Sequence, residues 1–272
     1  MKGWVNNVKK NRFEIDMCNG SIMDKLISFS LPLMVSGILQ LAFNAVDIIV
    51  VGRFSGSQAL AAVGSTTALI NVFTNLFIGI SLGANVLAAR FYAAGKDREM
   101  SETVHTSITL ALISGIMMAV IGVLLAKWAL EIMGTPDDVI GQSALYMRIY
   151  FMGMPFFMLY NYGAAILRAI GDTKRPLIFL IISGIANAAL NMILVILFHM
   201  GVAGVAIGTI ISQLISCVLV LTCLYRSEGS YQLRFSKLKI NGAYMEQIFQ
   251  VGVPAGIQST VINLSNALLQ SS

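Results

Sequence analysis

The stretch LPLMVSGILQLAFNAVDIIVVGRFSG, Leu31–Gly56, is apolar enough to lie inside a lipid bilayer, yet it contains a carboxylate, Asp47. A helix of about 20 apolar residues spans the hydrocarbon core of a membrane. A charge at the centre of the bilayer costs roughly 2.5–3.5 kcal/mol on insertion scales. The stretch therefore predicts a membrane-spanning helix and poses the question of what Asp47 does there.

The rest of the chain repeats this apolar pattern. Hydrophobic residues make up 57% of the sequence and charged residues only 11%, which is too little charge to cover a soluble domain of 272 residues. Backbone groups in lipid must be satisfied within their own segment, so the spans are helices. We expect an all-α polytopic membrane protein with six spans at about 26–52, 59–89, 104–126, 144–167, 176–198 and 202–225, and a seventh helix from near Ile248.

The basic residues indicate how the chain crosses the membrane. All but three of the 18 Lys and Arg residues precede the first span or follow the second, fourth or sixth span. The exceptions are Arg53, Lys127 and Arg148. This positive-inside pattern predicts a cytosolic N-terminus in the plasma or inner membrane. The net charge of +5 is then a sign of topology, and we expect no nucleic-acid partner.

The sequence also predicts an organisation in lobes. Shifting the chain by 222 residues places Pro32 over Pro254 in a weak internal match, and both segments enter the membrane from the same side. Parallel repeats of this kind are one architecture of secondary transporters. We therefore expect a second lobe of the same protein, cut off here. The predicted parts are a cytosolic leader at 1–25, a six-helix lobe at 26–225, a cytosolic linker at 226–247 and the start of the second lobe at 248–272.

Asp47 is the one carboxylate clearly within a predicted span, and it suggests a proton or cation site that faces the bundle interior. The alternative is an interfacial acid near Arg53. Asn187 and Asn191 are four residues apart and share a helix face, and Thr209 lies on the next span. Carboxylate, amide and hydroxyl oxygens together could hold Na⁺ or a proton. The alternative for the amides is ordinary hydrogen bonding between helices, worth about 0.6 kcal/mol per contact.

Other residues of these spans are candidates for a cavity wall and for hinges. The candidate wall residues are Gln40, Asn44, Asn71 and Asn75, with the same alternative of hydrogen bonding between helices. The candidate hinges are Pro32 and Pro155, because proline kinks or breaks a helix. The G-x-x-x-G pairs Gly79/Gly83 and Gly204/Gly208 favour close helix packing.

Motifs for enzymatic chemistry are absent from the sequence. It contains no Walker A motif, no zinc-ligand spacing and no Ser/His/Asp set, and we expect its two histidines, His105 and His199, in loops or interfaces. We therefore expect a protein that is not an enzyme, binds no nucleotide and needs no cofactor beyond a coupling ion, H⁺ or Na⁺.

Three segments together resemble the multidrug and toxic compound extrusion (MATE) family of cation-coupled antiporters. They are LPLMVSGILQLAFNAVDIIVVGRFSG, ILRAIGDTKRP and NAALNMILVILFHMGVAGVAIGTIISQ, and the resemblance covers nearly the whole chain. It implies twelve helices in two six-helix lobes that form a V around a central cavity. It also implies export of small organic, often cationic, compounds by alternating access, in exchange for Na⁺ or H⁺.

The resemblance implies roles for four residues. The family carries an acid on the first helix in a V-D-x-x-x-x-G setting, which Asp47 matches. Some members complete the cation site with an Asn and an Asp on the fifth helix and a Thr on the sixth. Asn187 and Thr209 match this pattern, but position 191 is Asn in place of Asp. The resemblance therefore implies one titrating carboxylate that carries a proton or a weakly held Na⁺.

Two other functions remain open from the sequence. A flippase for lipids or lipid-linked sugars would need a strongly basic cavity, and no intramembrane cluster of Lys or Arg is apparent. A membrane receptor or scaffold without transport predicts no ion-dependent flux and tolerance of substitution at Asp47. A membrane enzyme is a more distant alternative, because mostly amides lie near Asp47.

Overall fold

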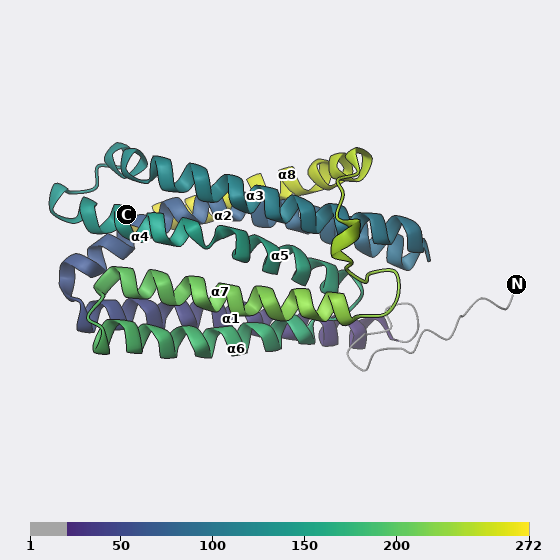
Figure 1. The fold of residues 1–272 in the computed structure, drawn as a ribbon, viewed down its shortest axis with the longest axis horizontal. Coiled ribbons are helices and arrows are strands. Elements are labelled where there is room, and N and C mark those ends of the chain that lie inside the picture. The colour runs from purple at the N-terminus through teal and green to yellow at the C-terminus, as the bar shows by residue number, and fades with distance from the viewer. Residues whose placement is uncertain (1–20, 272) are drawn as a thin grey trace, which may run out of the picture.

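The computed structural model describes residues 21–271, with the side chains of Ala68 and of residues 263–271 excepted, as a bundle of helices along one long axis (Figure 1). Most of the predicted leader, residues 1–20, lies outside this range. The described residues contain no strand, and the all-α prediction is confirmed. The helices are α1 (Ile22–Phe54), α2 (Gly56–Ala93), α3 (Asp97–Ile132), α4 (Asp137–Met152), α5 (Met154–Ala169), α6 (Lys174–Met192), η1 (Ile193–Leu197), α7 (Gly201–Arg226), η2 (Phe235–Lys237) and α8 (Gly242–Ser271).

Five helical segments are long and apolar enough to cross a membrane: α1, α2, α3, α6 with its extension through η1, and α7. The predicted fourth span, 144–167, is wrong as a single helix. It is divided between α4 and α5, which meet at Gly153 and both pack against α3. Pro155 lies in the first turn of α5. A proline has no backbone N–H and favours that position, which explains why a new helix starts here.

The helices differ from the prediction in three other ways. Most spanning helices extend beyond the apolar runs by a few residues, because polar residues at their ends continue the helix. The predicted fifth span changes to a π-helix at Ile193–Leu197, directly after the segment that contains Asn191. The last helix begins at Gly242 and not near Ile248, so the connection from α7 to α8 comprises residues 227–241. We call this connection the linker.

Two tight turns depend on glycine. Gly56 has a φ of +86° and reverses the chain between α1 and α2, which are separated by Ser55 alone. Gly171 has the same φ and separates α5 from α6. Glycine adopts this left-handed conformation without the steric penalty that a Cβ atom brings. Short turns of this kind bring consecutive helices to lie side by side in opposite directions.

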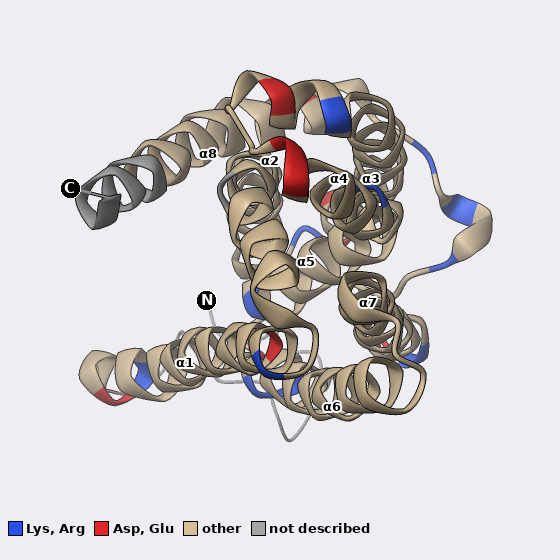
Figure 2. Cartoon of the chain, turned by 90° about the vertical axis from the view of Figure 1, so that its left-hand side faces the viewer, with Lys and Arg blue, Asp and Glu red and all other residues tan. Residues whose placement is uncertain are grey.

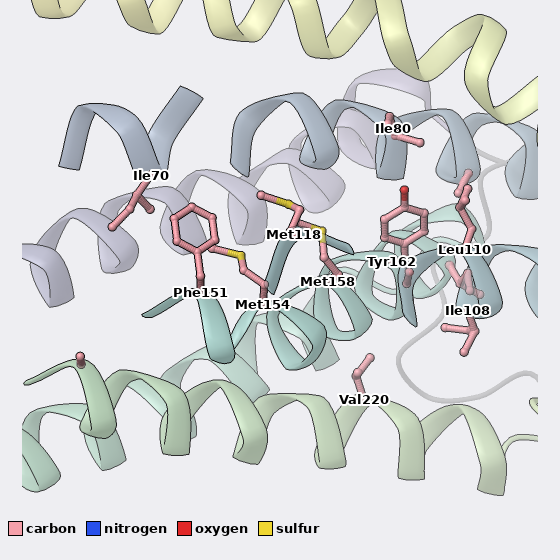
Figure 3. Packing of buried hydrophobic residues seen from close by; sticks show 14 of the residues in the cluster. Ile70, Ile80, Ile108, Leu110, Met118, Phe151, Met154, Met158, Tyr162 and Val220 are labelled. Atoms are coloured by element: carbon pink, nitrogen blue, oxygen red, sulfur yellow. The ribbon is translucent and has the colours of Figure 1, made fainter. Parts of the chain in front are cut away.

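The helices form two groups with α5 between them. Seen along the bundle, α1, α6 and α7 lie on one side, and α2, α3 and α8 lie on the other (Figure 2). α5 packs against α2, α3 and α7. Its side chains Met158 and Tyr162 are fully buried among these helices (Figure 3). The packed core therefore follows α5 and holds the two groups together.

Glycines bring α2 and α8 into backbone contact. A Cβ atom on Gly79 would lie 2.0 Å from the Cα atom of Gly256, and one on Gly83 would lie 2.2 Å from the carbonyl oxygen of Ile248. Neither position has room for any side chain. The close packing that the G-x-x-x-G spacing predicts for Gly79 and Gly83 is confirmed.

Candidate functional site

The polar residues of α1, α6 and α7 meet in one hydrogen-bonded group. Asn191 Nδ2 donates to Asp47 Oδ1 over 2.5 Å and to Asn187 Oδ1 over 3.3 Å. Asn187 Nδ2 donates in turn to Thr209 Oγ1 over 3.4 Å. The structure thus brings together all four residues that the sequence singles out for a cation site. We call Asp47, Asn187, Asn191 and Thr209 the polar cluster.

The hydrogen bonds leave specific oxygen atoms free in the polar cluster. Thr209 Oγ1 donates its own hydrogen to the carbonyl oxygen of Val205 over 2.9 Å. Asn191 is fully buried, and its Oδ1 atom has no hydrogen-bond partner among the described residues. Asp47 Oδ2 likewise accepts no hydrogen bond from them. A buried polar atom without a partner is costly, so Asn191 Oδ1 is an acceptor that remains open in the polar cluster. Asp47, on the cavity wall, supplies the negative charge that a bound cation or proton would engage.

Gly208 makes room for the side chain of Asn191. A Cβ atom on Gly208 would lie 2.2 Å from Asn191 Oδ1. One turn earlier, Gly204 lies close to the backbone of Leu194 in the π-helix. The two glycines let α7 approach α6, and Gly208 leaves the space in which the Asn191 amide reaches Asp47.

Most of the polar cluster lies on the wall of a cavity of about 310 Å³ inside this helix bundle, which we call the central cavity. Asp47, Asn187 and Thr209 line this cavity, whereas Asn191 lies behind its wall. The volume is at the lower end of the range of about 300–1,000 Å³ that is typical of sites for small organic molecules. The four residues predicted to line a cavity all lie on this wall: Gln40, Asn44, Asn71 and Asn75.

Other lining residues were missed from the sequence. Two of them are amides inside apolar spans, Asn161 and Gln213, and carry the same signal as Asn71. The aromatic residues carried no signal, because aromatic side chains are common throughout membrane spans. The aromatic lining residues are Phe43, Tyr150, Phe157 and Tyr160.

The charge of the cavity restricts what it can bind. Asp47 is the one carboxylate among the lining residues, and none of them is Lys, Arg or His. Among the described residues, no group of three or more His, Cys, Asp or Glu could hold a metal ion. The site therefore suits a proton or a single monovalent cation, together with a polar or cationic organic molecule. It is not the basic cavity that a pyrophosphate-carrying substrate would require.

The two candidate hinges lie in different settings. Pro32 is buried inside α1, which continues through it, and its carbonyl oxygen accepts a hydrogen bond of 2.8 Å from Ser36 Oγ. Pro155 follows the junction of α4 and α5 at Gly153 and does not kink a continuous helix. Pro32 thus lies in an intact helix, whereas Pro155 lies just after an existing break between two helices.

The chain is similar to members of one protein family. The model of the MatE family matches residues 32–193. The chain is 33% identical over 254 residues to the probable multidrug resistance protein YoeA of Bacillus subtilis. This match covers 90% of this chain and 54% of that protein. The chain is 28% identical over 255 residues to the multidrug export protein MepA of Staphylococcus haemolyticus, with 90% and 56% covered.

Solved structures agree on the fold. The structure described as the outward-facing conformation of a multidrug resistance MATE family transporter matches with a TM-score of 0.85 at 22% identity, over 93% of this chain and 56% of that one. The chain thus spans about half the length of the relatives it matches. The family match covers more than half of this chain and includes Asp47, Asn187 and Asn191. The predicted family is confirmed: this multi-pass membrane chain belongs to the MatE family, whose members are transporters and not enzymes.

Proposed function

We propose that this chain forms the first lobe of an ion-coupled exporter of small organic compounds that works by alternating access. The observation that carries the proposal is Asp47, the sole carboxylate on the wall of a polar cavity, hydrogen-bonded to the buried Asn191. The names of the relatives, which refer to multidrug resistance and export, support the same function. A second lobe from the remainder of the protein would complete the transport path.

In this mechanism Asp47 is the coupling group. Without a bound ion its carboxylate makes the cavity negative and favours a cationic organic molecule. A proton on Asp47 Oδ2, or Na⁺ between that atom and Asn191 Oδ1, neutralises the cavity and weakens the hold on that molecule. The coupling ion and the organic cation thus compete for the same negative charge on Asp47, and this competition is the simplest basis for exchange. A ligand can shift a conformational equilibrium only by its difference in affinity for the two states.

The energy of one ion is sufficient for this exchange. One elementary charge that crosses 100 mV supplies about 2.3 kcal/mol. A tenfold concentration ratio costs about 1.4 kcal/mol. One coupling ion per cycle therefore supports more than tenfold accumulation outside, where the substrate adds little opposing charge.

The conformational part of the proposal concerns α1. This helix contains both Pro32 and Asp47, and among the described residues it has few buried side chains. Ion loading at Asp47 alters its contact with α6 through Asn191 and biases bending of α1 near Pro32. The orientation we propose, with the N-terminus in the cytosol of a plasma or inner membrane, rests on the distribution of Lys and Arg.

The test uses the full-length gene product in liposomes. Efflux of a fluorescent organic cation is followed under imposed Na⁺ and H⁺ gradients for the wild type, Asp47→Asn and Asp24→Asn. Asp24 is exposed in the first turn of the same helix and serves as the matched control. We expect gradient-driven efflux from the wild type and the control and none from Asp47→Asn, and the effective gradient identifies the ion.

Three results would overturn parts of the proposal. Normal efflux by Asp47→Asn removes Asp47 as the coupling group. Flipping of a labelled lipid that Asp47→Asn leaves unchanged favours the flippase. Absence of any gradient-driven efflux from the folded, full-length wild type across a panel of organic cations favours a receptor or scaffold.

A further inference from the structure

A second cavity lies between the linker and the first turns of α3. Its volume is about 790 Å³, larger than that of the central cavity. The linker and the first turns of α3, whose residues line this second cavity, lie at the end of the bundle where α1 and α3 begin, on the right in Figure 1. None of its residues belongs to the polar cluster. We call it the linker cavity, and it is lined by Arg98, Ser101, Glu102, His105, Thr106, Lys237, Lys239, Ile240, Asn241 and Gly242.

Side chains of α3 fix the path of the linker. The backbone N–H of Asn241 donates to Thr106 Oγ1 over 3.2 Å, and that of Arg234 donates to His105 Nε2 over 3.1 Å. Both acceptors belong to buried side chains. Of the two predicted settings for His105, the loop is wrong, because His105 lies within α3. Its Nδ1 atom is bonded to the carbonyl oxygen of Ser101 over 2.6 Å. The linker is thus held by specific bonds, and the cavity it encloses has defined walls.

The single carboxylate of the linker cavity is already paired. Glu102 Oε1 accepts a hydrogen bond of 3.0 Å from Arg98 Nε, and Oε2 accepts one of 2.9 Å from Asn241 Nδ2. By contrast, Lys237 and Lys239 are exposed, and neither forms an ion pair with another described residue. Lys239 interacts electrostatically with Glu102, but Arg98 pairs with the same carboxylate. Three cationic side chains therefore line the cavity beside one carboxylate, and the net positive charge of this concave site favours an anion.

The surroundings of the linker cavity favour a lipid over a soluble anion. The linker extends sideways beyond α3 and α7 and carries several of its cationic residues there, drawn in blue (Figure 2). Tyr225 at the end of α7 stacks on Phe235 of the linker, with ring centroids 5.8 Å apart and an angle of 27° between the rings. Both residues are more than half exposed. Aromatic rings at the ends of spanning helices lie at the level of the lipid headgroups.

We propose that the linker cavity binds the phosphate headgroup of an anionic phospholipid. Lys237 and Lys239 contact the phosphate, and the Tyr225–Phe235 pair contacts the glycerol and the upper acyl chains. Basic pockets beside spanning helices are a known form of lipid recognition. Because the linker leads directly into α8, a bound lipid would fix the position at which the second lobe begins. The proposal depends on the membrane location of the protein and does not require Asp47 to be the coupling group.

The test measures lipid retention by the full-length protein. Wild-type protein is delipidated in detergent and offered phosphatidylglycerol or phosphatidylcholine with the same acyl chains, and bound lipid is counted by native mass spectrometry. We expect roughly tenfold preferential retention of phosphatidylglycerol by the wild type, and about twofold or less by the double variant Lys237→Gln/Lys239→Gln. The matched control is Lys127→Gln/Arg148→Gln, which removes two charges elsewhere in the chain and should keep the preference.

Two further experiments identify what the linker cavity binds. Glycerol phosphate, which has the headgroup charge but no acyl chains, should not compete with phosphatidylglycerol, and Phe235→Ala should weaken retention of the lipid. Equal retention of both lipids by the wild type, or an unchanged preference in the double lysine variant, overturns the proposal. Competition by glycerol phosphate overturns it in favour of a soluble phosphate compound. Gradient-driven efflux is also measured in liposomes without anionic lipid. This measurement does not depend on the lipid site, so a failure of the lipid proposal can be told apart from a failure of the transport function.

Discussion

Asn191 of α6 donates a hydrogen bond from Nδ2 to Asp47 Oδ1 of α1 over 2.5 Å, although the two residues are 144 positions apart in the chain. The bond joins α1, the least buried of the spanning helices, to the hairpin of α6 and α7. It also places a neutral amide where a second carboxylate would double the negative charge. The identity of residue 191 therefore sets how strongly the polar cluster can hold a cation.

The substitution Asn191→Asp should create a tighter Na⁺ site. It places a second carboxylate beside Asp47 and keeps the neutral oxygens of Asn187 and Thr209 close by. Carboxylate and neutral oxygens are the ligands that hard cations prefer. We expect Na⁺ affinity to rise by at least about tenfold, equivalent to about 1.4 kcal/mol. Isothermal titration of Na⁺ into the detergent-solubilised, full-length protein measures this change.

The matched control for that prediction is Asn161→Asp. Asn161 lines the same cavity but bonds the carbonyl oxygen of its own helix at Phe157. A carboxylate at position 161 adds the same charge to the cavity without completing the polar cluster. Equal gains in Na⁺ affinity for the two variants would show that charge in the cavity, and not the cluster geometry, determines ion binding.

The substitution Gly208→Ala should displace Asn191 from Asp47. The added methyl group would lie 2.2 Å from Asn191 Oδ1, well inside van der Waals contact. We expect gradient-driven efflux to fall at least about tenfold, since a small displacement at a coupling site is costly. Gly204→Ala, one turn away and tight against Leu194, controls for crowding between α6 and α7.

A double-variant cycle separates positioning from simple destabilisation. If Gly208 acts through Asn191, then Asn191→Ala alone and Asn191→Ala/Gly208→Ala should show the same residual efflux, because the amide that Gly208 accommodates is already gone. Independent effects would add for sites without a shared contact. An additive result, or an equal loss in Gly204→Ala, would refute the positioning role of Gly208.

The sequence predicted where most of the helices lie and which of their polar residues share a face, because both depend on local patterns. Apolar runs of sufficient length show where the chain crosses the membrane, and a spacing of four places Asn187 and Asn191 on one face. Helical periodicity does not say which face meets which neighbour. For this reason the sequence could not show that Asn191 lies behind the cavity wall while Asn187 lies on it.

Other differences arise from contacts that are distant in the chain. The break at Gly153 leaves no gap in the apolar pattern, so one span was predicted where the structure has two helices. The position of His105 beneath the linker depends on residue 234, which is 129 positions away. The contact of Gly79 with Gly256 was predicted only in its general form, as close packing, without its partner.

The ion pair of Asp172 and Arg175 should stabilise the turn between α5 and α6. Asp172 is fully buried. Its Oδ1 atom accepts the backbone N–H of Arg175 over 3.1 Å, and its Oδ2 atom lies 3.1 Å from Arg175 Nε. Loss of one partner of a buried pair typically costs about 3 kcal/mol or more. We expect Asp172→Ala to lower the thermal midpoint of the purified protein by roughly 6–12 °C.

Asp172→Asn is the informative partner variant. Its amide oxygen can still accept the N–H of Arg175, whereas the ion pair is lost. We expect a smaller decrease in the thermal midpoint than with Asp172→Ala. A loss as large as that of Asp172→Ala would assign the whole effect to the ion pair, and no loss in either variant would contradict a stabilising role.

The last prediction concerns the contact between α2 and α8. In Gly79→Ala the methyl carbon would lie 2.0 Å from Gly256 Cα, whereas carbon atoms pack at about 3.5–4.0 Å, so the helices must separate by roughly 1.5 Å. Overpacking of this kind costs about 1–3 kcal/mol. We expect a lower thermal midpoint and slower efflux by the full-length protein, because α8 follows the linker and leads into the second lobe. Gly64→Ala, on the same helix with no atom within 4 Å of the added Cβ, should leave both unchanged or raise the midpoint slightly. If the two variants behave alike, α2 and α8 are not in backbone contact at these glycines in the functioning protein.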